Sequence, residues 1–307
     1  MRCRKCGEKA AINMRQHRLS LCRPHFMQWL IDQTRHFIEK YEMFTSQERL
    51  LVAVSGGKDS LSLWDILWRL GYQTQGLYID LGIDEDINYS NESRQHAQKF
   101  ADDRDLTLIV YKMVEKIGRN LPVLAGDNRR GKEKPCSICG LVKRYIMNQV
   151  AHDEGYDVLV TAHNLDDEAA ILLSNTLDWS LKHLSRGQPV MPAGAGFTKK
   201  AKPFCRISER ESAAYALLRE IDYYDEECPY SKNSKQLYFK GYLNEWEDEM
   251  PGIKLRFYNN YLKAIEAGTF PNRQESPEEL IHQQCRSCGQ PTTADRLCAF
   301  CRITLEK

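Results

Sequence analysis

Residues 50–61 read LLVAVSGGKDSL, an apolar run that leads into a glycine-containing loop. Residues 49–54 predict a buried strand, and residues 61–70 predict a helix because their apolar positions recur at helical spacing. Two adjacent glycines let the backbone curl so that its N–H groups point at a phosphate, and the N-terminus of the next helix favours negative charge. The loop is not a Walker A motif, which has four residues between its glycines. We therefore expect phosphate binding by Ser55, Gly56, Gly57, Lys58, Asp59 and Ser60, the alternative being a glycine turn with a serine helix cap.

The alternation of strand and helix continues after this loop. Strands are predicted at residues 74–81, 106–113 and 157–162, and helices at residues 91–104, 140–154, 166–177, 213–221 and 244–267, the last with a break at Pro251. Residues 118–135 are predicted to be a loop and residues 187–202 to be irregular. Strands separated by helices predict an α/β fold, a parallel sheet with helices on both faces, and such sheets bind ligands at the carboxyl ends of their strands.

Composition limits the class of protein. A chain of 307 residues with 42% hydrophobic residues suits one sizeable domain with small attachments, not a disordered or collagen-like chain. The apolar runs are far shorter than the roughly 20 residues that span a bilayer, and the N-terminus lacks the apolar core of a secretory signal. We expect a soluble cytoplasmic protein with no membrane partner.

The net charge of +1 conceals an asymmetry. Residues 1–26 and 181–210 each carry seven Lys or Arg and one acidic residue, residues 112–145 carry nine and three, and residues 222–249 carry three and eight. The basic segments can form a surface that attracts an anionic polymer, or they can be scattered solvated faces.

The eleven cysteines fall into two terminal groups and an internal group. Cys3-x2-Cys6 with Cys22-x2-His25 has zinc-ligand spacing, and so has Cys285-x2-Cys288 with Cys298-x2-Cys301. Four protein ligands leave no open position, so both predicted zinc sites are structural rather than catalytic. The chain is thereby divided into an N-terminal module at residues 1–30, a catalytic domain at residues 31–270, and a linker with a C-terminal module at residues 271–307.

Two internal groups of residues suit chemistry. From the residues alone, Cys136-x2-Cys139 can be half of a zinc site or a redox pair, and Cys205 can be a small buried hydrophobe. The segment HNLDDE, residues 163–168, places adjacent acids at a predicted helix N-terminus. They can merely cap the helix, or one of them can join Asp59 in holding Mg²⁺ beside a triphosphate.

The loop SGGKDS resembles that of the PP-loop ATPases of the adenine-nucleotide alpha-hydrolase superfamily, which cleave ATP between the α and β phosphates. The order of further motifs narrows this resemblance: the N-terminal knuckle, YIDLGI, PCSICG, AHNLDDEA, ECPYS and the C-terminal four-cysteine knuckle. In that order the chain is similar over nearly its whole length to the tRNA 2-thiouridine synthetases of the TtuA/NcsA group.

The resemblance implies a set of functional residues. Cys136, Cys139 and Cys228 would hold a [4Fe-4S] cluster whose fourth iron is open to sulfide, and Asp59 and Asp167 would be catalytic beside ATP and Mg²⁺. Ile79, Lys143 and Ala162 would contact the nucleotide, although Ala162 stands where the family usually has glycine. The resemblance also implies that Cys136 and Cys228 take part directly in catalysis.

The implied function is a tRNA uridine 2-sulfurtransferase. Uridine O2 would be adenylated and then replaced by sulfur, at position 54 of the T-loop or, alternatively, at position 34 of the anticodon. The implied sulfur donor is a ubiquitin-like protein with a C-terminal thiocarboxylate, or free sulfide, and relatives suggest a homodimer. Rival interpretations are a cluster-free persulfide carrier, a non-catalytic RNA-binding protein and an amide-forming ligase.

Basic side chains near these motifs are candidates for contacts with the tRNA phosphates. Arg129, Arg130, Lys132 and Lys134 precede the internal cysteine pair, and Arg2, Arg4, Lys5, Arg15 and Arg18 lie in the N-terminal module. The alternative for the first group is a solvated loop.

Overall fold

The computed structural model describes residues 1–84, 88–231, 234–270 and 283–305, apart from the side chains of Arg129 and Arg130. The sequence predicts the linker to the C-terminal module at residues 268–277, most of which lie outside the described residues. Among those that are described, no helix is long and apolar enough to cross a membrane.

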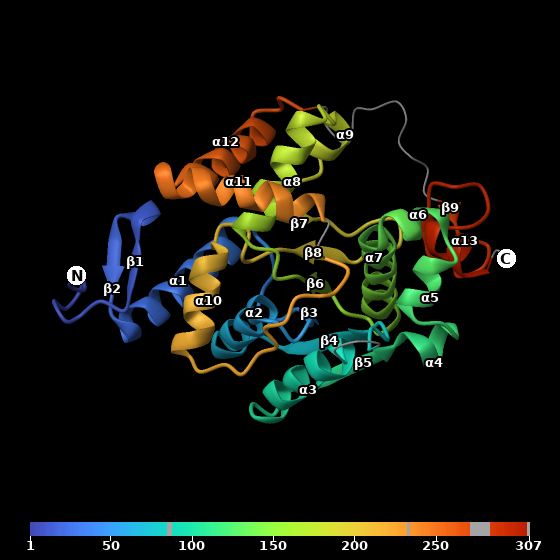
Figure 1. Cartoon of the computed structure of the whole chain (residues 1–307), viewed down its shortest axis with the longest axis horizontal. Helices are drawn as coiled ribbons and strands as arrows, with labels where there is room; N and C mark the ends of the chain where they lie inside the picture. Colours follow the sequence, from blue (N-terminus) through green and yellow to red (C-terminus); the bar gives the residue numbers. More distant parts are fainter. Residues whose placement is uncertain (85–87, 232–233, 271–282, 306–307) are drawn as a thin grey trace.

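A six-stranded sheet forms the centre of the molecule (Figure 1). Its strands, in spatial order, are β5 (Leu108–Lys112), β4 (Thr74–Asp80), β3 (Leu50–Val54), β6 (Val158–Val160), β8 (Lys199–Ala201) and β7 (Val190–Met191). All neighbours are parallel except β7, which pairs antiparallel with β8. The predicted α/β fold with a parallel sheet is confirmed.

Helices cover both faces of this sheet, as the alternation of side chains along β3 requires. Val52 and Val54 pack in the main core with residues of α1 (Arg23–Lys40), α2 (Lys58–Arg69), α3 (Tyr89–Asp102) and α10 (Glu209–Leu218). Leu51 points to the opposite face and packs in a second core that α7 (Pro135–Asp153) covers.

Three further long helices complete the upper layer in Figure 1: α8 (Leu165–Leu177), α11 (Lys235–Glu249) and α12 (Ile253–Glu266). Short helices are α4 (Met113–Ile117), α5 (Leu121–Gly126), α6 (Arg129–Glu133) and α9 (Leu181–Leu184). The spacing Ser208-x-x-Glu211 predicts a capping box, and the structure has this box at the start of α10.

Two small modules lie at opposite ends of the long axis (Figure 1). The N-terminal module contains β1 (Ile12–Met14), the 3-10 helix η1 (Arg15–His17) and β2 (Leu19–Leu21), and the C-terminal module contains β9 (Gln283–Gln284), β10 (Pro291–Thr292) and α13 (Ala299–Leu305). The C-terminal module packs on α7, where the rings of Tyr145 and Phe300 stack 3.7 Å apart.

Several predicted boundaries are wrong. Residues 118–135, predicted as a loop, contain α5 and α6, and α7 begins at Pro135 rather than at residue 140. Residues 187–202 contain β7 and β8, the edge of the main sheet. The helix predicted at residues 244–267 begins earlier, at Lys235, whereas its break near Pro251 and its end, at Glu266 of α12, are confirmed.

Candidate functional site

The loop after β3 has a fixed backbone shape. Gly56 has a φ of +80°, and a Cβ there would lie 2.1 Å from the carbonyl oxygen of Ser93, so no other residue fits. The Ser60 hydroxyl accepts a hydrogen bond from the Ser55 N–H at 3.1 Å and donates one to the Gly57 carbonyl at 3.0 Å. The loop therefore holds the N-terminus of α2, which begins at Lys58, at the carboxyl end of β3.

Four helices bring charged side chains together beside this loop. Lys58 of α2 contacts Asp59 at 3.3 Å and Glu209 of α10 at 2.8 Å. Lys240 of α11 contacts Glu209 at 3.0 Å and Asp167 of α8 at 2.7 Å. The result is a chain of alternating charges, two ammonium groups among three carboxylates, that joins residues far apart in the sequence.

These contacts shift the pKa values of the charged groups. Burial favours the protonated form of Glu209, but the ammonium groups of Lys240 and Lys58 outweigh it and lower the pKa of Glu209 to about 2. Burial would lower the pKa of Lys240, yet Asp167 and Glu209 raise it. Both partners of this pair are therefore charged at neutral pH.

Asp59 lies in a different electrostatic situation. Burial raises the pKa of its carboxyl, and the nearby carboxylates of Glu209 and Asp167 act in the same direction, against Lys58. Its Oδ1 atom is buried and has no hydrogen-bond partner among the described residues. An unpartnered buried carboxylate oxygen beside other carboxylates is a fitting ligand for a hard cation such as Mg²⁺.

The acidic segment after β6 divides into structural and pocket-facing residues. Asp166 accepts from Lys254 at 2.5 Å and from the Glu209 N–H at 2.8 Å, and Glu168 pairs with Lys202 at 2.8 Å. Asp167 caps its helix by accepting from the Asn164 N–H at 3.1 Å, while its other oxygen faces Lys240. Asp167 thus caps its helix with one carboxylate oxygen and contacts a side chain of another helix with the other.

One pocket of about 540 Å³ connects the loop to two of the internal cysteines. Its lining includes Ser55, Gly57, Lys58, Asp59, Asp167, Glu209, Lys240, Cys136 and Cys228, together with Tyr89, Tyr223 and Tyr224. The pocket places a phosphate-binding loop, carboxylates and thiols within one space that aromatic rings partly enclose.

The three internal cysteines come from two segments. Cys136 and Cys139 lie in the first turn and a half of α7, and Cys228 lies between α10 and α11. Burial raises the pKa of the Cys136 thiol, nearby Cys139 and Cys228 add to this, and Lys143 opposes it. Within the described ranges, the terminal groups alone bring three or more ligand atoms within 4.8 Å of one another. The internal thiols are more widely spaced than a single ion requires, which suits a larger iron–sulfur cluster.

Some predicted nucleotide contacts do not line the pocket. Ile79 on β4 packs in the second core, and Ala162 packs against the main core directly after β6. Lys143 and Cys139 lie close to the pocket-lining cysteines without lining the pocket themselves. Cys205 is fully buried among apolar residues, in agreement with a packing role.

Sequence reasoning missed three residues of the site: Glu209, Gln236 and Lys240. Gln236 donates to Asp167 at 3.3 Å and lies one turn before Lys240 on α11. Glu209 was passed over because the surrounding residues were interpreted only as a capping box. Lys240 lies in a segment that carried no predicted helix, so no spacing pointed to it.

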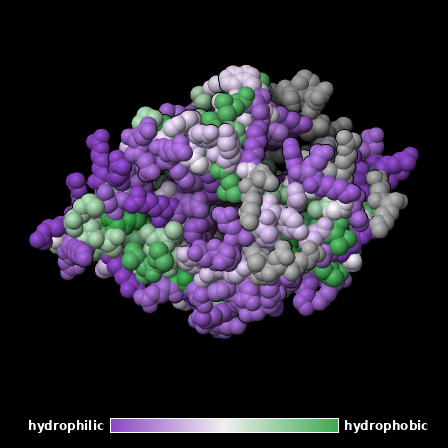
Figure 2. All heavy atoms as spheres, in the orientation of Figure 1, coloured by the Kyte–Doolittle hydropathy of each residue, from purple (hydrophilic) through white to green (hydrophobic). Residues whose placement is uncertain are grey.

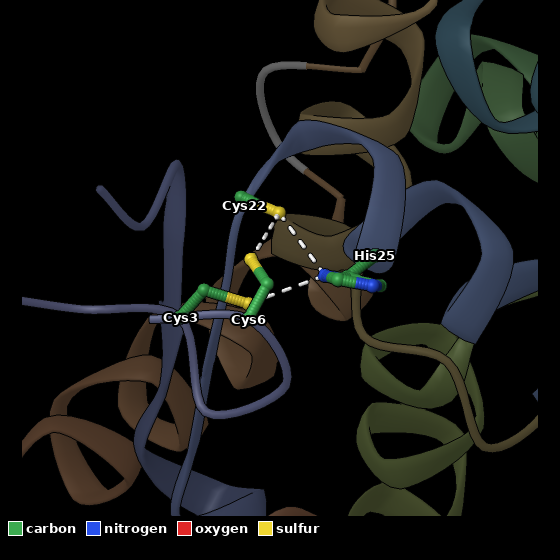
Figure 3. Close-up of side chains that lie close together, drawn as sticks. All are labelled: Cys3, Cys6, Cys22 and His25. Atoms are coloured by element: carbon green, nitrogen blue, oxygen red, sulfur yellow. Dashed lines mark hydrogen bonds between the residues drawn. The ribbon is translucent and has the colours of Figure 1, made fainter. Parts of the chain in front are cut away.

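The terminal groups have the geometry of single-metal sites. Cys3, Cys6, Cys22 and His25 converge from the knuckle and the start of α1 (Figure 3), with Cys6 and Cys22 sulfur atoms 3.7 Å apart. Cys288 and Cys298 sulfur atoms are 3.8 Å apart. Tetrahedral zinc with Zn–S bonds of about 2.3 Å separates its sulfur ligands by about 3.8 Å, so both donor sets fit this ion.

Comparison with known proteins identifies the relatives of this fold. A family model described as "2-thiouridine synthetase TtuA, N-terminal LIM domain" matches residues 2–27, and one described as "PP-loop domain" matches residues 27–243. The chain is 48% identical to the "tRNA-5-methyluridine(54) 2-sulfurtransferase" of Thermus thermophilus, over 99% of this chain and 91% of that protein. It is 39% identical to the protein of the same name from Pyrococcus horikoshii, over 99% and 93%.

A solved structure shares the whole fold. The "U34-tRNA thiolase NcsA from Methanococcus maripaludis with its [4Fe-4S] cluster" superposes with a TM-score of 0.81 at 24% identity, covering 99% of this chain and 95% of that one. At this identity the likeness establishes the fold alone.

Proposed function

Because the chain belongs to the family of PP-loop tRNA 2-sulfurtransferases, we propose that it adenylates the 2-oxygen of a tRNA uridine and replaces that oxygen by sulfur in the pocket described above. The observation that carries this proposal is the single pocket that joins the SGGKDS loop, Asp167, Cys136 and Cys228. A phosphate-binding loop alone would suit many ligases, whereas thiols at the far side of the same space suit sulfur transfer.

The first step uses the loop and its charged neighbours. Backbone N–H groups at the start of α2 and the Lys58 ammonium hold the phosphates of ATP. Uridine O2 attacks the α-phosphorus, a bond to AMP forms, and pyrophosphate leaves with the electrons of the broken P–O bond. Mg²⁺ held by Asp59 and Asp167 would offset charge on the triphosphate. Lys240 offsets part of the negative charge of Asp167 and Glu209 that would otherwise repel the phosphates.

The second step takes place at the cysteine side. Sulfide adds at the activated C2 of the uridine, and AMP departs with the former oxygen, which leaves a C–S bond in place of C–O. A [4Fe-4S] cluster bound by Cys136, Cys139 and Cys228 would supply an iron without a protein ligand, at which sulfide can bind. Burial raises the pKa values of the Cys136 and Cys228 thiols, and Lys143 opposes this by favouring their thiolate forms, the forms that bind metal.

The names of the two relatives support position 54 of the T-loop as the target, and the sulfur donor would be a thiocarboxylated ubiquitin-like protein or free sulfide. Mass spectrometry of tRNA nucleosides from cells that lack the gene tests this. Loss of a 2-thiouridine derivative at position 54 is the expected result. Loss at position 34 instead would overturn the choice of position, and unchanged nucleosides would overturn the function.

The cluster is tested separately from the reaction. Anaerobically purified protein should contain about four irons and four sulfides per chain, and Cys139→Ser should lower both. A colourless, iron-free protein that still thiolates tRNA would favour a persulfide on Cys136 or Cys228. A protein that binds tRNA but never releases pyrophosphate would favour a non-catalytic RNA-binding role.

The proposal also covers the domain division, the zinc ions and the oligomeric state. We infer zinc-binding modules at residues 1–30 and 271–307 around a catalytic domain at residues 31–270, with one Zn²⁺ in each module. We also infer a homodimer, which sedimentation of the purified protein tests.

A further inference from the structure

A second hollow, separate from the catalytic pocket, lies at the N-terminal end of the molecule. It has a volume of about 620 Å³ and is lined by Met1, Arg2, Arg4, Asn13, Arg15, Arg18, Ser20 and Pro251. Four guanidinium groups and no carboxylate contribute to this lining. We call it the arginine hollow.

The fold holds the walls of the arginine hollow in place. Arg2 and Arg4 flank the metal-ligating Cys3, and the Arg4 N–H donates to the Ser20 carbonyl at 2.9 Å. The Arg15 guanidinium donates to the carbonyl oxygen of Asp248 at 3.1 Å, which joins the module to the end of α11. The hollow is thus a built feature between two parts of the chain that are more than 200 residues apart.

The arginines of the hollow are not paired with carboxylates of the described residues. In the part of the chain that the structure describes, no ion pair involves any of its four arginines. Arg23, which lies just outside the module on α1, differs because it pairs with Glu220 at 2.7 Å. Unpaired guanidinium groups on a concave surface concentrate positive potential and attract phosphates, which they can bind in a bidentate manner.

The location of the hollow indicates which phosphates it suits. It lies at the end of the long axis that carries the N-terminus, whereas the loop after β3 lies at the centre of the molecule (Figure 1). The tip of that end is largely hydrophilic on the face that Figure 2 shows. An open, hydrophilic, basic hollow far from the reacting atoms suits the backbone of an extended polyanion better than a small buried ligand.

We propose that the arginine hollow holds phosphodiester groups of the tRNA substrate at a distance from the uridine that is modified. This proposal depends on one part of the proposed function, namely that tRNA is the substrate. Binding in the arginine hollow positions the tRNA without reading its sequence, because phosphate contacts fix the register and orientation of a nucleic acid and do not depend on which bases it contains.

The salt dependence of tRNA binding tests the proposal. The variant Arg4→Gln/Arg18→Asn removes two guanidinium groups; Asn suits position 18, where φ is 51°. Each lost phosphate contact should reduce the slope of log Kd against log salt by roughly 0.7 to 0.9, so the double variant should lose about 1.5 and bind tRNA roughly tenfold more weakly. The measurement is filter binding of an unmodified tRNA transcript at several salt concentrations.

Matched variants separate charge from folding. Lys9→Ala/Arg23→Ala removes the same charge from nearby residues that do not line the hollow, and should leave the slope nearly unchanged. Arg4→Lys/Arg18→Lys should restore most of the slope, and zinc content should be equal in all variants. An unchanged slope in Arg4→Gln/Arg18→Asn, or an equal loss in the control, would overturn the proposal. Because binding is measured without thiolation, failure of the proposed chemistry would leave this result interpretable.

Discussion

Asp166 and Asp167 are neighbours in the sequence, but their carboxylates lie in different environments. Asp166 is buried against the Lys254 ammonium, while Asp167 faces Lys240 in the pocket beside the SGGKDS loop. Asp166→Asn leaves Lys254 buried without a counter-charge and should lower the free energy of unfolding by about 3 to 5 kcal/mol. Asp167→Asn retains a cap-forming side chain and should cost less stability while abolishing tRNA thiolation.

Urea unfolding and a single-turnover thiolation assay on both variants check this contrast. If Asp167→Asn thiolates tRNA at the normal rate, or if Asp166→Asn is as stable as the natural protein, the division of roles between the two aspartates is wrong.

Glu209 connects stability to pH through its two lysine partners. Its pKa falls from the ordinary 4.5 to about 2 in the folded protein, so its ion pairs are fully present above about pH 4.5 and are lost as the pH falls towards 2. The natural protein should be more stable than Glu209→Gln at pH 6, and this difference should shrink between pH 4.5 and 3. Urea unfolding of both proteins across this range measures it; a difference that grows on acidification would contradict the assignment.

At the scale of elements, α7 connects the C-terminal module to the catalytic pocket. Tyr145 of α7 stacks on Phe300 of α13 with an interplanar angle of 6°, and Asn148 donates to Gln290 at 2.6 Å. The same helix carries Cys136 and Lys143. The C-terminal module therefore holds the helix that carries two of the three internal thiols, those of Cys136 and Cys139.

Truncation of the stacked ring tests this connection. Phe300→Ala removes a ring that is 7% exposed and should cost about 3 kcal/mol, with faster hydrogen exchange in α7. Leu305→Ala changes the same helix at a residue that is 60% exposed and should have little effect. Equal exchange in α7 for the two variants would show that the module does not support this helix.

The elements that sequence predicted well are those with a strong local signal. The strand–loop–helix unit around SGGKDS combines a buried apolar run, a glycine turn and a periodic helix, and the structure has all three. Residues 118–135 were predicted wrongly because Gly, Asn and Pro favour a loop locally. There α5 forms because Leu121 and Leu124 are buried against the elements around α7, a contact that local composition does not reveal.

For the candidate site, too, the sequence predicts residues with a local motif but not their partners from distant segments. Lys58 and Asp59 follow from the loop motif, and Asp167 from the acidic segment, but the partners that join them do not. Glu209 and Lys240 lie 31 residues apart on different helices, and only the packing of α11 against α8 brings Lys240 to Asp167. Pairs of this kind leave no periodic pattern in a single sequence.

At the scale of the whole molecule, the two small modules contact different helices that border the pocket between the SGGKDS loop and the internal cysteines. The N-terminal module reaches α10, where Gln16 and His17 both lie 2.9 Å from Glu211, the residue that closes the capping box beside Glu209. The C-terminal module reaches α7. Each module is too short to fold on a core of its own, so its metal ion should stabilise one wall of the pocket and leave the other unchanged.

Removal of one metal ligand at each end distinguishes these two connections. Cys6→Ser should lower bound zinc from about two ions per chain to about one and speed hydrogen exchange in α10, whereas Cys288→Ser should lower zinc equally but affect α7. The central sheet has its own buried core, so its slowly exchanging amides should be retained in both variants. Elemental analysis gives the zinc content and mass spectrometry the exchange. If both variants changed hydrogen exchange in the same helix, loss of a ligand at one end would act through the shared sheet rather than through its own module, and the separate stabilisation of the two pocket walls would be refuted. A variant that retained two zinc ions would show that the substituted cysteine is not required to bind zinc.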